Sequence, residues 1–160
     1  MKKVNHILQN PKYRKMIEQI NILEADRPYC RHGLSHLLDV ARIAYIISLE
    51  NQYQVDKEVT YGAALLHDIG KAGQYLNGIP HEVESVRIAP DIWQEAGYSQ
   101  EEIKIMTEAV LGHRKPADTK GNSLKSILYI ADKKSRACFN CEVDSTCNWS
   151  DHKRNRQLEY

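Results

Sequence analysis

Seven histidines and four cysteines are the residues of this 160-residue chain best suited to metal chemistry. Three of the cysteines form a C-terminal trio within ten residues, at Cys138, Cys141 and Cys147. Histidine, cysteine and aspartate are the usual protein ligands of zinc and of redox-active divalent metals. In a reducing compartment such clustering favours metal or thiol chemistry over a set of disulfide bonds.

Helices must position these residues, because helical spacing of apolar residues dominates the sequence and strand signals are almost absent. We expect one all-α domain, a bundle of seven or eight helices. The expected helices cover 12–25, 33–50, 56–70, 81–97, 99–113, 123–137 and 151–160. Pro90 predicts a bend or interruption, residues 71–80 predict a loop, and Ser99 with Glu102 predicts a capping box.

The composition excludes several classes of protein. Twenty-two Lys plus Arg against 21 Asp plus Glu leave a net charge of +1, so there is no overall basic footprint for nucleic acid or a membrane. No apolar run approaches the roughly 20 residues that span a bilayer, and residues 1–15 lack the apolar core of a signal peptide. We therefore expect a cytoplasmic protein that meets any anionic partner through a local site.

The length suffices to bury a core without help from metals or disulfides. We expect residues 1–137 to form the helical domain, including its N-terminal helices. Residues 138–160 are expected to form a cysteine-containing extension packed on the same domain.

Four expected helices each carry one metal-competent residue on a buried stripe. His36 and His81 stand at the N-terminal ends of their stripes. His113 and Asp132 stand at the C-terminal ends of theirs. Side chains at this spacing share one helix face, so all four point to the interior.

The adjacent pair His67 and Asp68 ends a fifth helix, in the sequence AALLHDIGK. Neighbouring helix residues point about 100° apart, which suits a carboxylate shared between two ions. Each group alone also fits a hydrogen-bonded core residue, and Asp132 could pair with Lys133 or Arg136. Six such groups on five helices favour metal binding, because a core does not tolerate so many unsatisfied polar groups.

The ordered motif resembles the H…HD…D signature of the HD-domain superfamily of metal-dependent phosphohydrolases, over about residues 30–136. The signature residues, in the contexts SHLLDVARIA, ALLHDIGK and YIADKKSR, are His36, His67, Asp68 and Asp132. His81 and His113 resemble the two extra histidines of binuclear members. These members include bacterial symmetrical dinucleoside-tetraphosphate hydrolases and HD-GYP phosphodiesterases.

The resemblance implies an HD-type fold that binds one or two divalent transition-metal ions. The signature residues would hold the first ion, and His81, His113 and a shared Asp68 would hold the second. Iron, manganese, zinc, cobalt and nickel all suit these ligands. A metal-activated hydroxide would then hydrolyse a phosphoester or phosphoanhydride bond in a nucleotide or similar small phosphorylated compound.

Candidate phosphate-binding residues flank the predicted ligands. Lys71 lies one turn beyond Asp68, and Arg114 directly follows a predicted ligand; either could instead be a solvated helix-end cation. The spacing of His32 before the first signature residue resembles the HD-x-x-H lead-in of some members, with Gly33 in place of the usual Asp. We expect Asp68 and Lys71 to act in catalysis. Lys71, Arg114 and His32 are the candidates for substrate binding, in a pocket shaped by residues 71–80 and 114–122.

Cys30 lies six residues before His36, which would share an ion with Asp132. The two helix ends must then lie near each other, which could bring Cys30 to the C-terminal trio. Four thiolates could hold a structural zinc ion or an iron–sulfur cluster. The alternative is a set of reduced thiols that bind nothing.

Two other functions fit the same ligands. One is a di-iron oxygenase of the HD type, since its ligand set overlaps with that of a hydrolase. The other is a regulatory module that keeps the metal, or senses redox state through the cysteines, without turnover.

Overall fold

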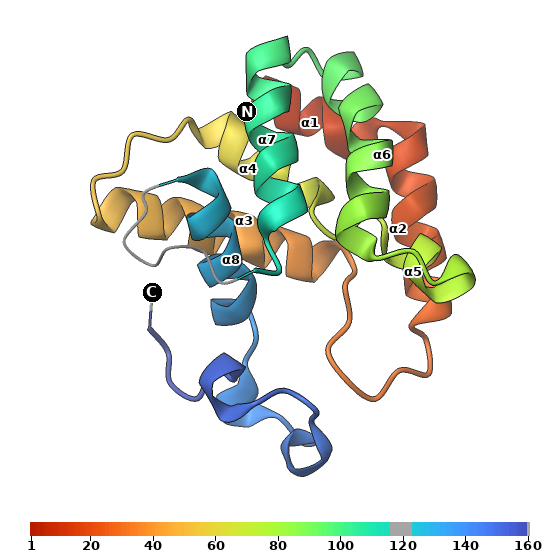
Figure 1. The fold of residues 1–160 in the computed structure, drawn as a ribbon, viewed down its shortest axis with the longest axis vertical. Coiled ribbons are helices and arrows are strands. Elements are labelled where there is room, and N and C mark those ends of the chain that lie inside the picture. The colour runs from red at the N-terminus through yellow and green to blue at the C-terminus, as the bar shows by residue number, and fades with distance from the viewer. Residues whose placement is uncertain (116–122, 160) are drawn as a thin grey trace.

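The computed structural model describes residues 1–115 and 123–159. Within these ranges the chain forms eight α-helices, three short 3-10 helices and no strand (Figure 1). The α-helices are α1 (Lys2–Gln9), α2 (Pro11–Leu23), α3 (Leu34–Glu50), α4 (Lys57–Leu66), α5 (Lys71–Asn77), α6 (His81–Glu95), α7 (Gln100–Gly112) and α8 (Leu124–Lys134). The predicted all-α fold class is confirmed, and most of the predicted segment 114–122 lies outside the described residues.

Capping side chains fix the starts of several helices. The Asp56 carboxylate accepts from the Val59 N–H at 2.9 Å and begins α4. Ser99 and Glu102 form the predicted capping box at the start of α7, with bonds of 3.2 and 2.7 Å. Each cap satisfies backbone donors that the first helical turn leaves free.

Helix α5 occupies residues 71–77, where the sequence predicted a loop. Gly78 ends this helix at φ +71°, the left-handed conformation that glycine favours. Gly73 lies so close to α6 that an added Cβ would come within 2.7 Å of the Glu84 Cγ. The two glycines that indicated a loop therefore allow a short helix to end sharply and to pack closely.

Three further predictions are corrected. Helix α1 was not predicted, because its eight residues bury little beyond Val4 and Ile7. Helix α6 continues through Pro90, because burial of the flanking side chains outweighs the lost backbone hydrogen bond. In residues 151–159 there is only a 3-10 helix, Asp151–Lys153, since this charged segment has no apolar stripe to bury.

One hydrophobic core holds the site-bearing helices together. Helix α3 packs against α4 and α8, and α7 packs against α4, α6 and α8. Trp93 of α6 is fully buried, and its indole N–H donates to the Gly62 carbonyl of α4 at 3.0 Å. This link fixes α4 against α6, whose ends carry His67 and His81.

The segment after α8 lies at one end of the molecule, outside the main body of helices (Figure 1). Its contacts reach the loop between α2 and α3. The Tyr29 hydroxyl donates to the Thr146 carbonyl at 3.2 Å, and the Arg136 guanidinium donates to the Arg31 carbonyl at 2.7 Å. Among the described residues, no helix combines the length and the apolar character needed to cross a membrane.

Candidate metal centre

The six predicted ligands converge at one point of the fold. They come from α3, the end of α4, the start of α6, the end of α7 and α8. All are buried, with at most 8% of their surface exposed: His36, His67, Asp68, His81, His113 and Asp132. Helix ends bring these side chains together from positions far apart in the sequence.

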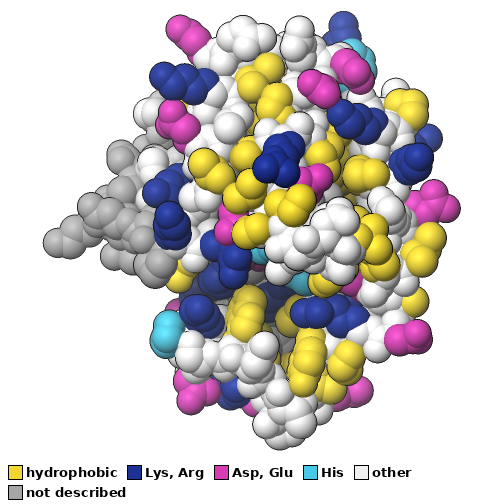
Figure 2. Space-filling view, turned by 45° about the vertical axis from the view of Figure 1, so that its right-hand side comes forward, with side chains coloured by type: hydrophobic (Ala, Val, Ile, Leu, Met, Phe, Trp, Pro, Cys, Tyr) yellow, Lys and Arg dark blue, Asp and Glu magenta, His cyan; other side chains and the backbone are white. Residues whose placement is uncertain are grey.

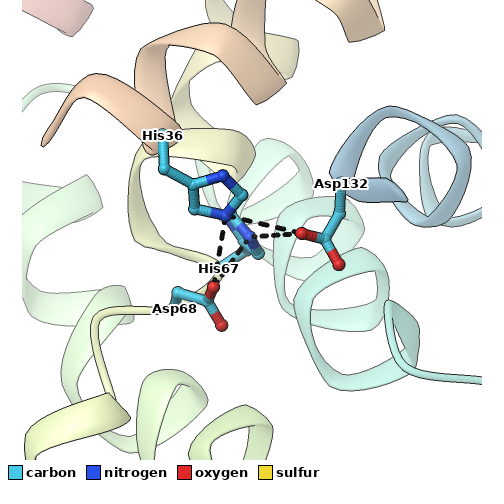
Figure 3. Close-up of side chains that lie close together, drawn as sticks. All are labelled: His36, His67, Asp68 and Asp132. Carbon is cyan, nitrogen blue, oxygen red and sulfur yellow. Dashed lines mark ion pairs between the residues drawn. The ribbon is translucent and has the colours of Figure 1, made fainter. Parts of the chain in front are cut away.

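The four signature residues form a first group, whose ligand atoms all lie within 4.8 Å of one another. The Oδ2 atom of Asp68 lies 3.5 Å from the Nε2 of His36 and 3.2 Å from that of His67. The Oδ1 atom of Asp132 lies 3.4 Å from the same nitrogen of His36. Figure 3 shows the four side chains pointing toward one another.

A second group consists of Asp68, His81 and His113, again within 4.8 Å. Here the other carboxylate oxygen is used: Oδ1 of Asp68 lies 3.1 Å from the Nε2 of His81 and 3.8 Å from that of His113. One carboxylate thus presents each of its oxygens to a different group. This is the arrangement that a carboxylate shared between two ions requires.

A partner on the far side of each ring fixes the histidine orientations. The Nδ1 atoms of His67 and His113 donate to backbone carbonyls of their own helices, at 2.7 and 2.6 Å. That of His81 donates at 2.7 Å to the side-chain oxygen of Gln74, a residue of α5 that the sequence analysis missed. Because a carbonyl only accepts, Nδ1 carries the proton, and Nε2 is left with a lone pair facing the centre.

Unsatisfied atoms show that the centre fits a cation. Four buried side-chain polar atoms in the described ranges lack a hydrogen-bond partner, and two of them are His67 Nε2 and Asp68 Oδ1. Leaving such atoms unpaired in a core is costly. A divalent ion at each group would satisfy both with a suitable mix of imidazole and carboxylate ligands.

The charge states of the ligands also suit a cation. Burial lowers the pKa of His81 to about 2 and that of His113 to about 4. Burial acts in the same direction on His67, but the carboxylates of Asp68 and Asp132 raise its pKa to about 9. Burial would raise the pKa of both carboxylates, yet the neighbouring histidines hold it well below the usual range. Ionised carboxylates and neutral imidazoles are the forms that ligate metals, so a bound ion would displace the proton that the two carboxylates favour on His67.

The centre opens into a pocket of about 240 Å³. Six cationic side chains line it: Arg27, Lys71, Arg114, Lys133, Arg136 and Lys153. Figure 2 shows a hollow bordered by Lys and Arg side chains, with histidine visible inside it. A protein with a net charge of +1 therefore concentrates positive charge around the candidate ligands.

The predicted cations differ in their distance from the centre. The Nζ of Lys71 lies 3.9 Å from Asp68 Oδ1, within the ligand cluster. Arg114 stays half-exposed at the pocket and pairs with Glu82 at 3.2 Å, which offsets its charge. Lys71 is the better placed of the two to contact a substrate beside the ligands.

The pairing of Asp132 with Lys133, considered as an alternative to metal binding, is present. It uses Oδ2, which lies 2.5 Å from the lysine Nζ, whereas Oδ1 faces His36 and His67. Because the two interactions use different oxygens, the ion pair leaves one oxygen of Asp132 available as a ligand.

His32 lies beside the first group, with its Nε2 4.0 Å from Asp68 Oδ2. On the opposite side of its ring, His32 contacts Glu24, a residue that no sequence pattern indicated. This carboxylate is 1% exposed and accepts from the Nδ1 of His32 at 2.5 Å and from the Tyr75 hydroxyl at 2.5 Å. Burial would raise the pKa of Glu24, but the bonds from His32 lower it to about 2. Glu24 could not be identified from the sequence, because it is a single Glu at a helix end and its partner Tyr75 lies far away along the chain.

Comparison with known proteins identifies a family to which the sequence is similar. The family model of the HD domain matches residues 33–147. The chain is 42% identical over 160 residues to an uncharacterized protein of Clostridium beijerinckii, with both chains fully covered. It is also 31% identical over 119 residues to ribonuclease Y of Acetivibrio thermocellus. That match covers 73% of this chain but only 20% of the ribonuclease, so the chain spans about a fifth of that relative.

A solved structure shares the fold. The crystal structure of a predicted HD superfamily hydrolase from an uncultured Thermotogales bacterium matches with a TM-score of 0.63 and 23% identity. The match covers 89% of this chain and 81% of that chain. None of these relatives is named as a dinucleoside-tetraphosphate hydrolase, so the resemblance to that subgroup stays a prediction.

Proposed function

The chain belongs to the HD domain family, and from this premise we propose that it is a metal-dependent phosphohydrolase acting on a nucleotide or similar small phosphorylated compound. The observation that carries the proposal is the position of Asp68, whose two oxygens face two buried ligand groups. Bound divalent ions would supply an activated water and neutralise charge on a phosphate.

The residues around the ligands would bind and orient the substrate. Lys71 would donate to a phosphate oxygen held beside Asp68. Burial lowers the pKa of His32, so its ring is neutral at neutral pH. Since its Nδ1 donates to Glu24, its Nε2 can only accept. We therefore place His32 against a water or a substrate hydroxyl rather than against a phosphate oxygen.

The size and charge of the pocket support a small anionic substrate. A volume of about 240 Å³ is below the usual range for drug-sized ligands, and its lining cations suit phosphate. The ribonuclease Y relatives raise RNA as a second substrate class. The net charge of +1 favours the small compound, because a long polyanion is normally bound by an extended basic surface.

A hydrolysis panel, in which the products are separated by chromatography and released phosphate is also measured, tests the proposal. The protein would be loaded separately with manganese, iron, cobalt or nickel and mixed with mononucleotides, nucleoside triphosphates, dinucleoside polyphosphates, other phosphoesters and a short RNA. We expect metal-dependent hydrolysis of at least one small compound, which is lost in Asp68→Asn and kept in Asp91→Asn. Asp91 is the matched control because it is exposed and pairs with Lys12, on a different part of α6 from His81. Cleavage of the RNA alone would overturn the small-substrate proposal.

The same panel separates the two alternative functions. Activity that requires iron and oxygen, with none under manganese, would indicate the oxygenase. Bound metal without hydrolysis of any compound would indicate a regulatory module.

A further inference from the structure

The structure brings Cys30 to the C-terminal trio. All four cysteines are free thiols, and all four line the pocket that also contains the metal centre. The hydrogen bond from Tyr29 to Thr146 joins the two segments that carry them. Burial raises the pKa of the Cys30 thiol, and the other three thiols raise it further, as expected for neighbours. Four soft ligands from distant parts of the chain therefore surround one space.

The spacing of the sulfur atoms distinguishes between metals. Within the described ranges, the groups whose ligand atoms all lie within 4.8 Å are the two His/Asp groups, and the four thiols do not form one. A single tetrahedral zinc with bonds of about 2.3 Å would need sulfur atoms about 3.8 Å apart. An iron–sulfur cluster is several atoms across and spreads its four thiolates more widely. No three of the four sulfur atoms thus lie as close together as one zinc ion requires, whereas a cluster would bridge a larger gap.

The C-terminal segment also lacks a core of its own. Residues 138–159 contain three 3-10 helices, and their buried side chains are Cys138 and Asn155. The large apolar side chains of Phe139 and Leu158 are 50% and 68% exposed. A segment with so little apolar burial usually needs a metal or a disulfide to fix it.

Arg136 independently indicates that the four thiols carry negative charge. Its guanidinium is buried: one Nη atom donates to the Nε2 of His36 at 2.9 Å, where a bound ion would displace it, and the other donates to the Arg31 carbonyl. None of the ion pairs within the described residues involves Arg136, and its Nε lacks a hydrogen-bond partner. A buried cation without a counter-charge is costly. Cys30 is close enough for the guanidinium to lower its pKa, so thiolates would supply that charge.

We propose that Cys30, Cys138, Cys141 and Cys147 bind an iron–sulfur cluster that fastens the C-terminal segment to the loop between α2 and α3. The cluster would form one wall of the pocket beside the His/Asp centre. This inference does not depend on phosphohydrolase activity.

Reconstitution of the full chain tests the cluster. The purified protein would be treated without oxygen with ferric iron, a thiol reductant and sulfide, then analysed for iron, acid-labile sulfide, zinc and visible absorption. We expect bound iron and sulfide and a broad visible absorption. Cys141→Ser and Cys147→Ser should each lose the sulfide and the absorption, whereas Asp68→Asn should keep both, because its defect lies at the His/Asp centre.

Other results would overturn the proposal. Zinc or iron bound without sulfide, or serine variants that keep the sulfide, would show that the thiols do not hold a cluster. A Mössbauer spectrum of the unsubstituted protein gives a test that needs no variant. It should show iron in sulfur coordination, and iron with nitrogen and oxygen ligands alone would contradict the cluster.

Discussion

Lys71 and Asp68 lie at the point where a phosphate would meet the ligand groups. The Nζ of the lysine is 3.9 Å from Asp68 Oδ1, longer than a hydrogen bond. Its charge nevertheless helps to keep the pKa of Asp68 low. The ammonium group is therefore close to the centre but retains donors for another anion.

Lys71→Met should weaken phosphate binding while keeping the apolar stem of the side chain. We expect kcat/KM to fall roughly 10- to 100-fold, corresponding to one lost charge-assisted hydrogen bond. The comparison uses the substrate found in the hydrolysis panel, with Lys104→Met, at an exposed position of α7, as the control. An unchanged kcat/KM would remove Lys71 from the substrate site.

Glu24→Gln should destabilise the fold, because an amide replaces a buried carboxylate that accepts bonds from His32 and Tyr75. The folded pKa of about 2 lies below the ordinary 4.5, so the charge stabilises the protein above about pH 4.5, and this contribution is lost as the pH falls toward 2. At pH 7 the loss should be about 3 kcal/mol.

Urea unfolding of the metal-free protein measures this change. Glu18→Gln, an exposed change on the same helix, is the control and should have little effect. Equal stability of Glu24→Gln and the unsubstituted protein at pH 7 would show that Glu24 does not organise this side of the centre.

The sequence could reveal the ligands but not the residues behind them. His36 and Asp132 lie on apolar stripes, so helical periodicity alone directs them inward. Glu24 and Gln74 act through partners that only the folded chain brings near. Gln74 was also hidden because its helix was predicted as a loop.

At the scale of elements, Gly70 sets how closely the start of α5 approaches α6. A Cβ at this position would come 2.4 Å from the His81 carbonyl oxygen and 2.5 Å from the Ser85 nitrogen. The Gly70 N–H also donates to the Ser85 hydroxyl at 2.9 Å. These are backbone contacts at the residue that places His81, so they cannot adjust by side-chain rotation.

Gly70→Ala should therefore displace the start of α6 and weaken metal binding by the second group. We expect a loss of about 1–3 kcal/mol in stability, as for overpacked cores, and a lower affinity for the second ion. Thermal unfolding and metal titration measure the two effects. Gly73→Ala is the control, since its Cβ meets the flexible Glu84 side chain. Equal behaviour of the two variants would contradict this account.

Local signals predicted the helices that begin with a cap or carry an apolar stripe, such as α4 and α7. They failed where tertiary contact decides the structure. Gly73 and Gly78 indicated a loop. In the structure, Gly73 lets α5 pack closely against α6, and Gly78 ends α5. Pro90 read as a break, although the buried side chains of Ala89 and Ile92 hold α6 in place on both sides of it.

For the whole molecule, the near-zero net charge conceals a strongly polarised arrangement. Cations gather around one pocket, while the carboxylates of Asp68 and Asp132 lie buried beneath it. The composition could exclude a global basic surface, but not locate this local one. That location depends on how the helix ends meet, which is a property of the complete fold.

Removal of metal should lower the stability of the entire chain, because ions that bind only the folded state stabilise it. With a free ion at about 100 times its dissociation constant, the loss is about 2.7 kcal/mol. For a chain of this size this corresponds to roughly 5–10 °C in Tm. Thermal unfolding with and without a chelator checks this, and Asp68→Asn should show a smaller difference. A Tm unaffected by chelation would contradict metal binding by the folded protein.

The most direct test of the central claim is a calorimetric titration of the metal-free protein with manganese. This ion prefers oxygen and nitrogen ligands, so the thiols contribute little. We predict two bound ions for the unsubstituted protein, and one ion for the His81→Ala/His113→Ala variant, which keeps the signature residues. Failure to bind manganese, or the same stoichiometry in both proteins, would contradict a centre in which Asp68 serves two ions.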